Sequence, residues 1–318
     1  MSDLKVSISF YSSDGLFISE GCRILHKITQ NKNERSDADN GTIKKRLLHL
    51  HCLEEILMKR IGIDAGGYLT KIAYEENNRL RLKTYPSNRI DEIIQWLKTL
   101  APEASLHVTG GRAEALKNDH ASIFKEFECI LEGTRYLLME ENKLPDTDYL
   151  LVNIGTGTSF FHQQERLSGT GVGGGLFTGV GAIIANTSNY HKLVDLASKG
   201  DRTKSDLMVS DIYQFSQAPI KASLTAANFG KNQLDVSVSA EDQLAALTQL
   251  IGETIVLLAS KTAASLDTKE MVMIGGALSG NPLLKKIIAS FDSMFDYHLT
   301  FLEKGSHAGA IGALYYDG

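Results

Sequence analysis

The sequence predicts a mixed α/β fold made of two related lobes, because one supersecondary pattern occurs twice along the chain. A short apolar strand, a glycine-rich turn and a returning strand occupy residues 60–74, and the same succession recurs at residues 149–163. Helices with an apolar residue every three or four positions follow, as expected for elements that cover a sheet. We expect the two glycine turns, at matching places of a repeated plan, to oppose each other across a cleft.

Composition indicates a protein that binds small molecules. The chain has 318 residues, of which 43% are hydrophobic and 22% charged, with a net charge of −5 and a pI near 6.0. This length allows one large domain or two modest ones, and the slight acidic surplus argues against nucleic acid and membrane surfaces as partners. Cys22, Cys52 and Cys129 have no metal-site spacing and suit a reducing compartment. Since no apolar run of membrane length is found, we expect a cytoplasmic protein.

Residues 1–57 are expected to be an N-terminal extension that is disordered or foreign to the native protein. Residues 31–40 are strongly polar, and no clear pair of elements is visible around them. A helix can form over residues 49–57, but His49, His51 and Cys52 lack a fourth ligand, so no metal site is expected there. Met58 stands just before the first clear strand, where the first residue of the native protein is expected.

The stretch over residues 60–74 is a candidate phosphate clamp. Ile61 and Ile63 mark a short strand that ends on Asp64, and Gly66-Gly67 allow a tight turn. Amide groups of such a turn can approach an anion closely, and a strand-end carboxylate can hold Mg²⁺ together with a nucleotide. The alternative is a plain β-hairpin, since Gly-Gly is a common hairpin turn.

The remaining elements of the first half follow from apolar spacing. We expect strands over residues 70–74, 79–85 and 105–109, a helix beginning near residue 90, and a longer helix over residues 121–142. Glu126 and Glu128 lie two positions apart on this longer helix. At 3.6 residues per turn they point roughly 200° apart, so only one of them can face a cleft.

The second half carries a glycine-rich stretch with no counterpart in the first. Residues 166–181 are expected to pack their backbone against a ligand, with close helix packing as the alternative. A long apolar helix over residues 241–266 suits a core or a dimer face. A strand over residues 271–274, a helix over residues 282–289 and a small-residue helix over residues 305–314 complete the chain.

Six segments together resemble a known family. They are residues 62–67 with Lys71, residues 153–159, Arg166, residues 173–175, residues 224–230 and residues 309–314. Their collinear order from Met58 onward is similar to that of the bacterial type II pantothenate kinases. The resemblance implies the actin-like, hexokinase and Hsp70-like ATPase fold, with two ribonuclease-H-like lobes and a nucleotide cleft between them. It implies an N-terminal lobe over residues 58–147 and a C-terminal lobe with the dimer helix over residues 148–318.

The resemblance also implies which residues contact ATP. They are Gly66, Gly67, Tyr68, Leu69, Thr70, Lys71, Ile72 and Ala73 in the first half, and Thr156, Gly174, Gly175, Leu176, Phe177, Thr178, Tyr190 and Gly276 in the second. Asp64 is then expected to face Mg²⁺. Tyr68 stands where the family usually has threonine, so a bulky phenol replaces a hydroxyl beside the phosphates.

Two residues match active-site residues of the family. Glu126 corresponds to the catalytic base, and Arg166 to an arginine that neutralises charge near the substrate or the transferring phosphoryl group. The implied activity is the ATP- and Mg²⁺-dependent phosphorylation of pantothenate by a homodimer.

Two other functions are weighed on the same fold. A sugar kinase of the repressor-related kind typically has a cysteine cluster for zinc, which three scattered cysteines cannot supply. A non-catalytic actin-like nucleotide-binding regulator would need a DNA-binding head, and residues 1–57 show no helix-turn-helix pattern.

Overall fold

A computed structural model describes residues 60–317 except residues 118–119, 215–216 and 234–236. All described residues belong to one compact unit, Ile56–Gly318. The helix considered over residues 49–57, the histidines and cysteine within it, and the start proposed at Met58 lie outside the described residues.

The first sheet has five strands in the order β3-β2-β1-β4-β5. The strands are β1 (Arg60–Ala65), β2 (Leu69–Glu76), β3 (Arg79–Pro86), β4 (Ser105–Thr109) and β5 (Ala121–Ile123). The first three form an antiparallel meander, as predicted, whereas β4 and β5 run parallel to β1. Helix α3 (Ile90–Leu100) covers one face, where Ile93 and Leu97 pack against Ile61 and Ile63.

The second sheet repeats this topology strand for strand. Its order is β12-β11-β6-β7-β8, formed by β6 (Tyr149–Ile154), β7 (Thr158–His162), β8 (Glu165–Thr170), β11 (Glu270–Ile274) and β12 (His298–Phe301). Again the first three strands are antiparallel, and the last two run parallel to the first. The predicted duplication of strand, glycine turn and strand is therefore confirmed, and it extends to the whole sheet.

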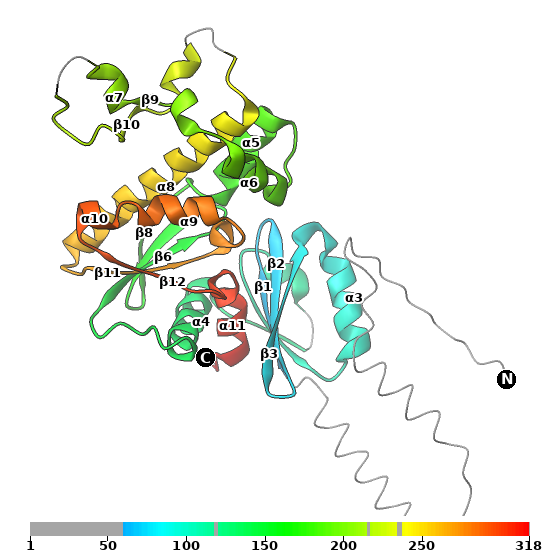
Figure 1. Ribbon diagram of the computed structural model, residues 1–318. Helices are drawn as coiled ribbons and strands as arrows, with labels where there is room; N and C mark the ends of the chain where they lie inside the picture. The colour runs from blue at the N-terminus through cyan, green and yellow to red at the C-terminus, as the bar shows by residue number, and fades with distance from the viewer. Residues whose placement is uncertain (1–59, 118–119, 215–216, 234–236, 318) are drawn as a thin grey trace, which may run out of the picture. The chain divides into compact units, whose positions relative to one another are not determined.

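Helices of the second half cover one face of the second sheet (Figure 1). They are α5 (Gly174–Ala185), α6 (Tyr190–Lys199), α8 (Ala240–Ser265), α9 (Pro282–Ala289) and α10 (Asp292–Phe295). Leu150, Val152 and Ile154 of β6 point into this core, while Leu151 points to the opposite face, as the two-residue period of a strand requires. A small two-stranded sheet of β9 (Leu207–Met208) and β10 (Thr225–Ala227), with α7 (Val209–Ile212), lies beside the α8 region.

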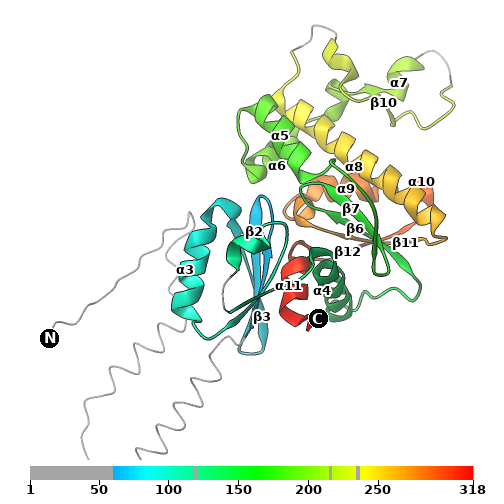
Figure 2. The same cartoon turned by 180° about the vertical axis from the view of Figure 1, so that it is seen from behind.

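Two helices, α4 (Glu126–Glu140) and α11 (Ala308–Tyr315), pack side by side on the faces of both sheets (Figures 1 and 2). Their backbones touch, because a Cβ added to Gly133 would lie 1.9 Å from the Ala308 carbonyl oxygen and one added to Gly312 would lie 1.7 Å from that of Cys129. Gly62 of β1 makes the same kind of close backbone contact with α11. The small residues predicted for the last helix are thus explained by backbone contact.

The predicted helix over residues 121–142 is wrong at its start. Ala121–Ile123 form β5, which pairs in parallel with β4 through Leu106–Ala121 and Val108–Ile123. An unpaired sheet edge binds an extended segment irrespective of its helical spacing, so tertiary pairing overrides the local pattern here. Glu126 consequently becomes the first residue of α4.

Helix α8 is more apolar than the sequence analysis expected. Among the described residues, α8 is long and apolar enough to cross a bilayer by length and composition, whereas the sequence analysis found no such run. However, 67% of its most apolar window is buried within the protein. Its apolar residues are therefore explained by the core of the second half.

Candidate active site

A cleft of about 560 Å³ is lined by both glycine turns and by the N-terminal ends of α4 and α11. This volume is typical of small-molecule sites. The charged side chains in its lining are those of Asp64, Lys71, Glu126 and Arg166. The cleft therefore gathers residues that are far apart in the sequence and of both signs of charge.

Ser87 holds the first glycine turn in place through two hydrogen bonds. The Ser87 hydroxyl donates to the Gly66 carbonyl oxygen at 2.8 Å, and the Ser87 amide donates to the Tyr68 carbonyl oxygen at 2.9 Å. On the cleft side, Lys71 Nζ donates to Asp64 Oδ2 at 3.3 Å, and both side chains are largely enclosed, with 17% and 14% exposure. Asp64 is thus a pre-positioned carboxylate with one cation beside it.

The stretch predicted to bind phosphate does not lie wholly in the cleft. Gly66, Gly67 and Lys71 line it. Tyr68 and Leu69 are exposed outside the lining residues, with Tyr68 at 63% exposure. Thr70, Ile72 and Ala73 are fully buried, so their side chains serve the fold.

The second glycine turn is fixed by the glycine triplet that follows it in the sequence. The amides of Gly174 and Gly175 donate to the carbonyl oxygens of Gly155 and Thr156, both at 2.8 Å. A Cβ on Gly173 would lie 2.9 Å from the Thr156 oxygen, so only glycine permits this approach. The triplet thus packs its backbone against the turn, and the expectation that residues 166–181 also border a ligand stays a prediction.

Glu126, not Glu128, faces the cleft. Glu126 lines it, and burial and the nearby Asp64 raise the Glu126 pKa, while Lys71 lowers it. Glu128 accepts hydrogen bonds from Lys125 Nζ at 2.7 Å and from the Tyr316 hydroxyl at 3.0 Å, and these bonds lower its pKa. The two carboxylates, two positions apart, thus have opposite environments.

Arg166 reaches the cleft from an edge strand. It lies on β8, where a bulge in the pairing with β7 occurs between Phe160 and Phe161. Arg166 Nε donates to Ser159 Oγ at 3.3 Å, and its guanidinium carbon lies 5.7 Å from the centre of the Phe127 ring. Bulges often re-aim a side chain beside a site, and here the bulge accompanies the contacts of Arg166 with groups of the cleft. The sequence analysis did not foresee β8.

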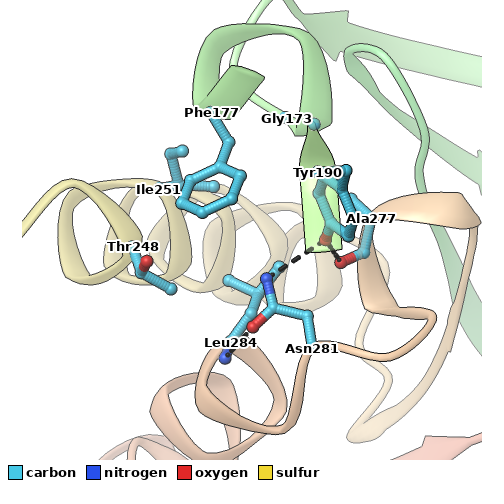
Figure 3. A pocket seen from close by; sticks show the side chains of 9 residues that line it. Gly173, Phe177, Tyr190, Thr248, Ile251, Ala277, Asn281 and Leu284 are labelled. Carbon is cyan, nitrogen blue, oxygen red and sulfur yellow. Dashed lines mark hydrogen bonds between the residues drawn. The ribbon is translucent and has the colours of Figure 1, made fainter. Parts of the chain in front are cut away.

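Three other predicted nucleotide residues line a separate small cavity (Figure 3). Gly174, Phe177 and Tyr190 border a space of about 10 Å³ between α5, α6, α8 and α9. The Tyr190 hydroxyl donates to the Ala277 carbonyl oxygen at 2.5 Å and accepts from Asn281 Nδ2 at 3.1 Å. Burial raises the Tyr190 pKa, so the phenol stays neutral. This cavity is closed to anything larger than a water-sized group in the present conformation.

The other predicted nucleotide residues are Thr156, Leu176, Thr178 and Gly276, and they occupy different surroundings. Thr156 lines the cleft, and Gly276 precedes Ala277 of the small cavity. Leu176 packs on the core of the second half, and the Thr178 hydroxyl donates to the Gly174 carbonyl oxygen at 3.0 Å inside α5. Their link to the cleft is the pair of backbone hydrogen bonds between the triplet and the second turn.

The duplication shows a residue that the sequence analysis missed. Asn153 occupies the next-to-last position of β6, as Asp64 does in β1, and Asn153 pairs with Ser159 as Asp64 pairs with Lys71. All four side chains belong to the cleft lining. The charged pair of the first half is thus matched by a neutral polar pair in the second. Superposing the two repeated patterns would have identified Asn153 from the sequence.

The contacts of His307 were also not predicted from the sequence. Its Nε2 lies 3.0 Å from Thr84 Oγ1 of β3 and its Nδ1 lies 3.0 Å from Ser306 Oγ, just before α11. Burial, with Lys71 nearby, lowers the His307 pKa to about 4, so the ring is neutral at neutral pH. His307 therefore ties the start of α11 to the first sheet. No sequence spacing signals this contact.

Comparison with known proteins places the chain among close relatives. The protein family Fumble matches residues 75–316. The chain is 56% identical over 259 residues to the type II pantothenate kinase of Oceanobacillus iheyensis, covering 81% of this chain and 99% of that protein. It is 36% identical over 267 residues to the type II pantothenate kinase of Staphylococcus aureus strain USA300, with the same coverage of 81% and 99%.

Solved structures with low sequence identity share the fold. Component A of the (R)-2-hydroxyglutaryl-CoA dehydratase of Acidaminococcus fermentans has a TM-score of 0.56 at 16% identity, covering 80% of this chain and 95% of that one. The activator of the 2-hydroxyisocaproyl-CoA dehydratase of Clostridium difficile, solved with bound ADPNP, has a TM-score of 0.53 at 18% identity, covering 81% and 93%. At these identities the likeness concerns the fold alone.

Proposed function

The chain belongs to the type II pantothenate kinase family, and from this premise we propose that it phosphorylates pantothenate with ATP. The product is 4'-phosphopantothenate, and the reaction is the first step of coenzyme A biosynthesis. The observation that carries the proposal is the cleft in which two glycine turns meet Asp64, Glu126 and Arg166. Phosphoryl transfer asks a protein mainly for positioned groups that absorb charge, and this lining supplies both.

ATP is proposed to place its phosphates between the two glycine turns. Gly66, Gly67 and Gly157 leave room for backbone amides to approach an anion, and Lys71 supplies a positive charge on the same side. The rest of the nucleotide is proposed to extend toward the small cavity of Tyr190 and Phe177. Because that cavity is only about 10 Å³ here, the bound base requires Tyr190 or its neighbours to move.

Mg²⁺ fits this site as a companion of ATP. Among the described residues no group of three or more histidine, cysteine or acidic side chains could hold a metal ion. Mg²⁺ in kinases usually takes only one or two carboxylates and completes its shell with phosphate oxygens and water. Asp64 is the proposed protein ligand, with Asn153 opposite it in the duplicated plan. The ion, when bound with ATP, would neutralise phosphate charge.

The acceptor hydroxyl is proposed to lose its proton to Glu126. The hydroxyl oxygen of pantothenate forms a bond to the γ-phosphorus while the bond to the β-phosphate oxygen breaks, and ADP leaves with that electron pair. The hydroxyl proton passes to the Glu126 carboxylate, which becomes a carboxylic acid. A raised pKa makes Glu126 a stronger base than an ordinary glutamate.

Arg166 is proposed to bind negative charge at the mouth of the cleft. Its guanidinium lies against Phe127, so it is oriented without being paired to a carboxylate in the described contacts. An arginine fork free to receive an anion suits the carboxylate of pantothenate or the transferring phosphoryl group.

A cytoplasmic homodimer is the proposed form of the protein. Leu257 and Leu258 of α8 are 44% and 42% exposed, although most of the helix is buried. Two adjacent exposed leucines on a long helix suit a face that a second copy covers. Light scattering after size-exclusion chromatography tests this, and a monomeric mass at micromolar concentration would contradict it.

One coupled assay tests the proposed activity. The purified chain is incubated with ATP, Mg²⁺ and pantothenate, and ADP release is followed together with the mass of the product. We expect ADP to form in step with phosphopantothenate. A panel of sugars serves as the control, because turnover of a sugar without turnover of pantothenate would assign a different kinase activity to the same cleft.

A further inference from the structure

The carboxylate of Asp64 lies between two glycines from distant parts of the chain. Gly110 follows β4, and Gly309 lies in the first turn of α11. A Cβ on Gly110 would lie 2.7 Å from Asp64 Oδ1, and a Cβ on Gly309 would lie 3.0 Å from Asp64 Oδ2. Each carboxylate oxygen therefore lies close to the backbone of a glycine, and a side chain at either position would collide with it.

The two glycines differ in what they require of the backbone. Gly110 has φ +94°, a value that favours glycine on its own account, and its added Cβ would also meet the Ala65 carbonyl oxygen at 2.7 Å. Gly309 is helical, and the three atoms nearest to its added Cβ all belong to the Asp64 side chain: Oδ2 at 3.0 Å, Cγ at 3.1 Å and Cβ at 3.4 Å. Gly309 thus has no backbone reason to be glycine, and alanine would suit the helix better.

Helix α11 is held beside Asp64 by two further contacts. Three positions along the helix, about 60° round its axis from Gly309, Gly312 meets the Cys129 backbone of α4, where an added Cβ would lie 1.7 Å from the carbonyl oxygen. At its start His307 contacts Thr84 Oγ1 on β3 at 3.0 Å. Because these contacts hold the backbone of α11, the Asp64 side chain is the group expected to move when a Cβ is added at Gly309.

The helix end beside Asp64 has a favourable charge. The first amides of a helix carry partial positive charge, which stabilises a carboxylate close to them. Lys71 Nζ, at 3.3 Å from Asp64 Oδ2, adds a full positive charge on the same oxygen. Close approach of α11 thus restricts the directions in which the Asp64 carboxylate can point.

We propose that Gly309 is a positioning residue: by lacking a Cβ it lets α11 lie against Asp64 and sets the carboxylate direction that receives the metal ion and nucleotide. This inference rests on the proposed metal-binding role of Asp64 within the proposed function. It predicts that Gly309→Ala weakens metal binding without weakening the fold.

The test measures binding of Mn²⁺ in the presence of ADP, by electron paramagnetic resonance of free Mn²⁺, on the full chain. We expect Gly309→Ala to weaken Mn²⁺ affinity about tenfold, the usual scale for a residue that orients a metal ligand. Its melting temperature should be unchanged or higher. Gly179→Ala is the matched control, because Gly179 lies inside α5 with nothing within 4 Å of an added Cβ, and it should leave Mn²⁺ affinity unchanged.

Unchanged Mn²⁺ affinity in Gly309→Ala would overturn the inference. If Gly309→Ala instead unfolds, the double variant Asp64→Ala with Gly309→Ala decides, because removing the Asp64 carboxylate must restore folding if that contact is responsible. Failure to restore it also overturns the inference. Asp64→Ala alone separates the two proposals: Mn²⁺ affinity equal to that of the unaltered chain contradicts the metal role itself, while pantothenate turnover is judged independently on the unaltered chain.

Discussion

The carboxylates of Glu126 and Asp64 line the same cleft, and burial, together with the charge of Asp64, raises the pKa of Glu126. Lys71 acts on both, since it donates to Asp64 Oδ2 and lowers the Glu126 pKa. Two carboxylates in unequal environments around one ammonium group can have different roles: Asp64 is paired with the lysine, and Glu126, whose pKa is raised, is the stronger base.

The first prediction concerns the assignment of the base. Glu126→Gln keeps the size of the side chain but cannot accept the hydroxyl proton, so kcat should fall by at least about a hundredfold. Binding of ATP and the melting temperature should change little. Glu128→Gln is the matched control, because Glu128 is bonded to Lys125 and Tyr316 outside the cleft lining, and it should remain largely active. The reverse outcome would mean that the base assignment is wrong.

A second prediction concerns Arg166. Arg166→Ala should remain folded, since the side chain is exposed on an edge strand, but kcat/KM for pantothenate should fall roughly a hundredfold with the loss of a charge-binding group. Arg166→Lys should recover only part, because a point charge cannot reproduce a two-pronged guanidinium. Steady-state kinetics measure both, with Arg135→Ala, an exposed arginine paired with Glu132, as control. Normal activity in Arg166→Ala would exclude Arg166 from the reaction.

A third prediction concerns the contact between α4 and α11. Gly312→Ala places a Cβ 1.7 Å from the Cys129 carbonyl oxygen, so the two helices must separate, and the free energy of unfolding should fall by about 3 kcal/mol or more. Chemical denaturation monitored by circular dichroism measures this. Gly179→Ala, with open space around the added Cβ, should be neutral or stabilising by up to about 1 kcal/mol. Equal stability of the two variants would contradict the backbone contact.

A fourth prediction concerns the pH dependence of stability through His307. Burial lowers its pKa from 6.5 to about 4, so between these values the unfolded chain binds a proton that the folded protein does not. The free energy of unfolding should therefore rise with pH across this window and decline as pH falls from about 6.5 toward 4, by at most about 3 kcal/mol.

The variant His307→Gln isolates that contribution. It retains a polar side chain beside Thr84 but has no proton to gain, so its stability should change less between pH 7 and pH 5 than that of the unaltered chain. His107, whose pKa is also lowered by burial, is present in both proteins and cancels in the comparison. Identical pH slopes in urea denaturation would show that His307 is not the group responsible.

Local sequence signals predicted the elements whose conformation is determined by their own residues. The hairpin of Gly66-Gly67, helix α8 and the small-residue helix α11 were predicted because glycine turns, apolar periodicity and small residues have the same meaning in isolation as in the fold. Glu126 and Arg166 were identified from the family resemblance. By contrast β5 and β8 were missed, since a strand at a sheet edge exists only because another strand offers it hydrogen bonds.

The sequence by itself determined that the chain contains two copies of one strand-turn-strand pattern, that Asp64 ends the first strand, and which family the motifs resemble. Only the tertiary structure decided that the glycine triplet at residues 173–175 supports the second turn and that Gly309 lies against Asp64. The physical reason is the sequence separation over which each interaction acts. Turn and helix preferences act over a few neighbouring residues, whereas these contacts join residues far apart in the chain, whose meeting depends on how the two sheets and the α4–α11 pair pack together.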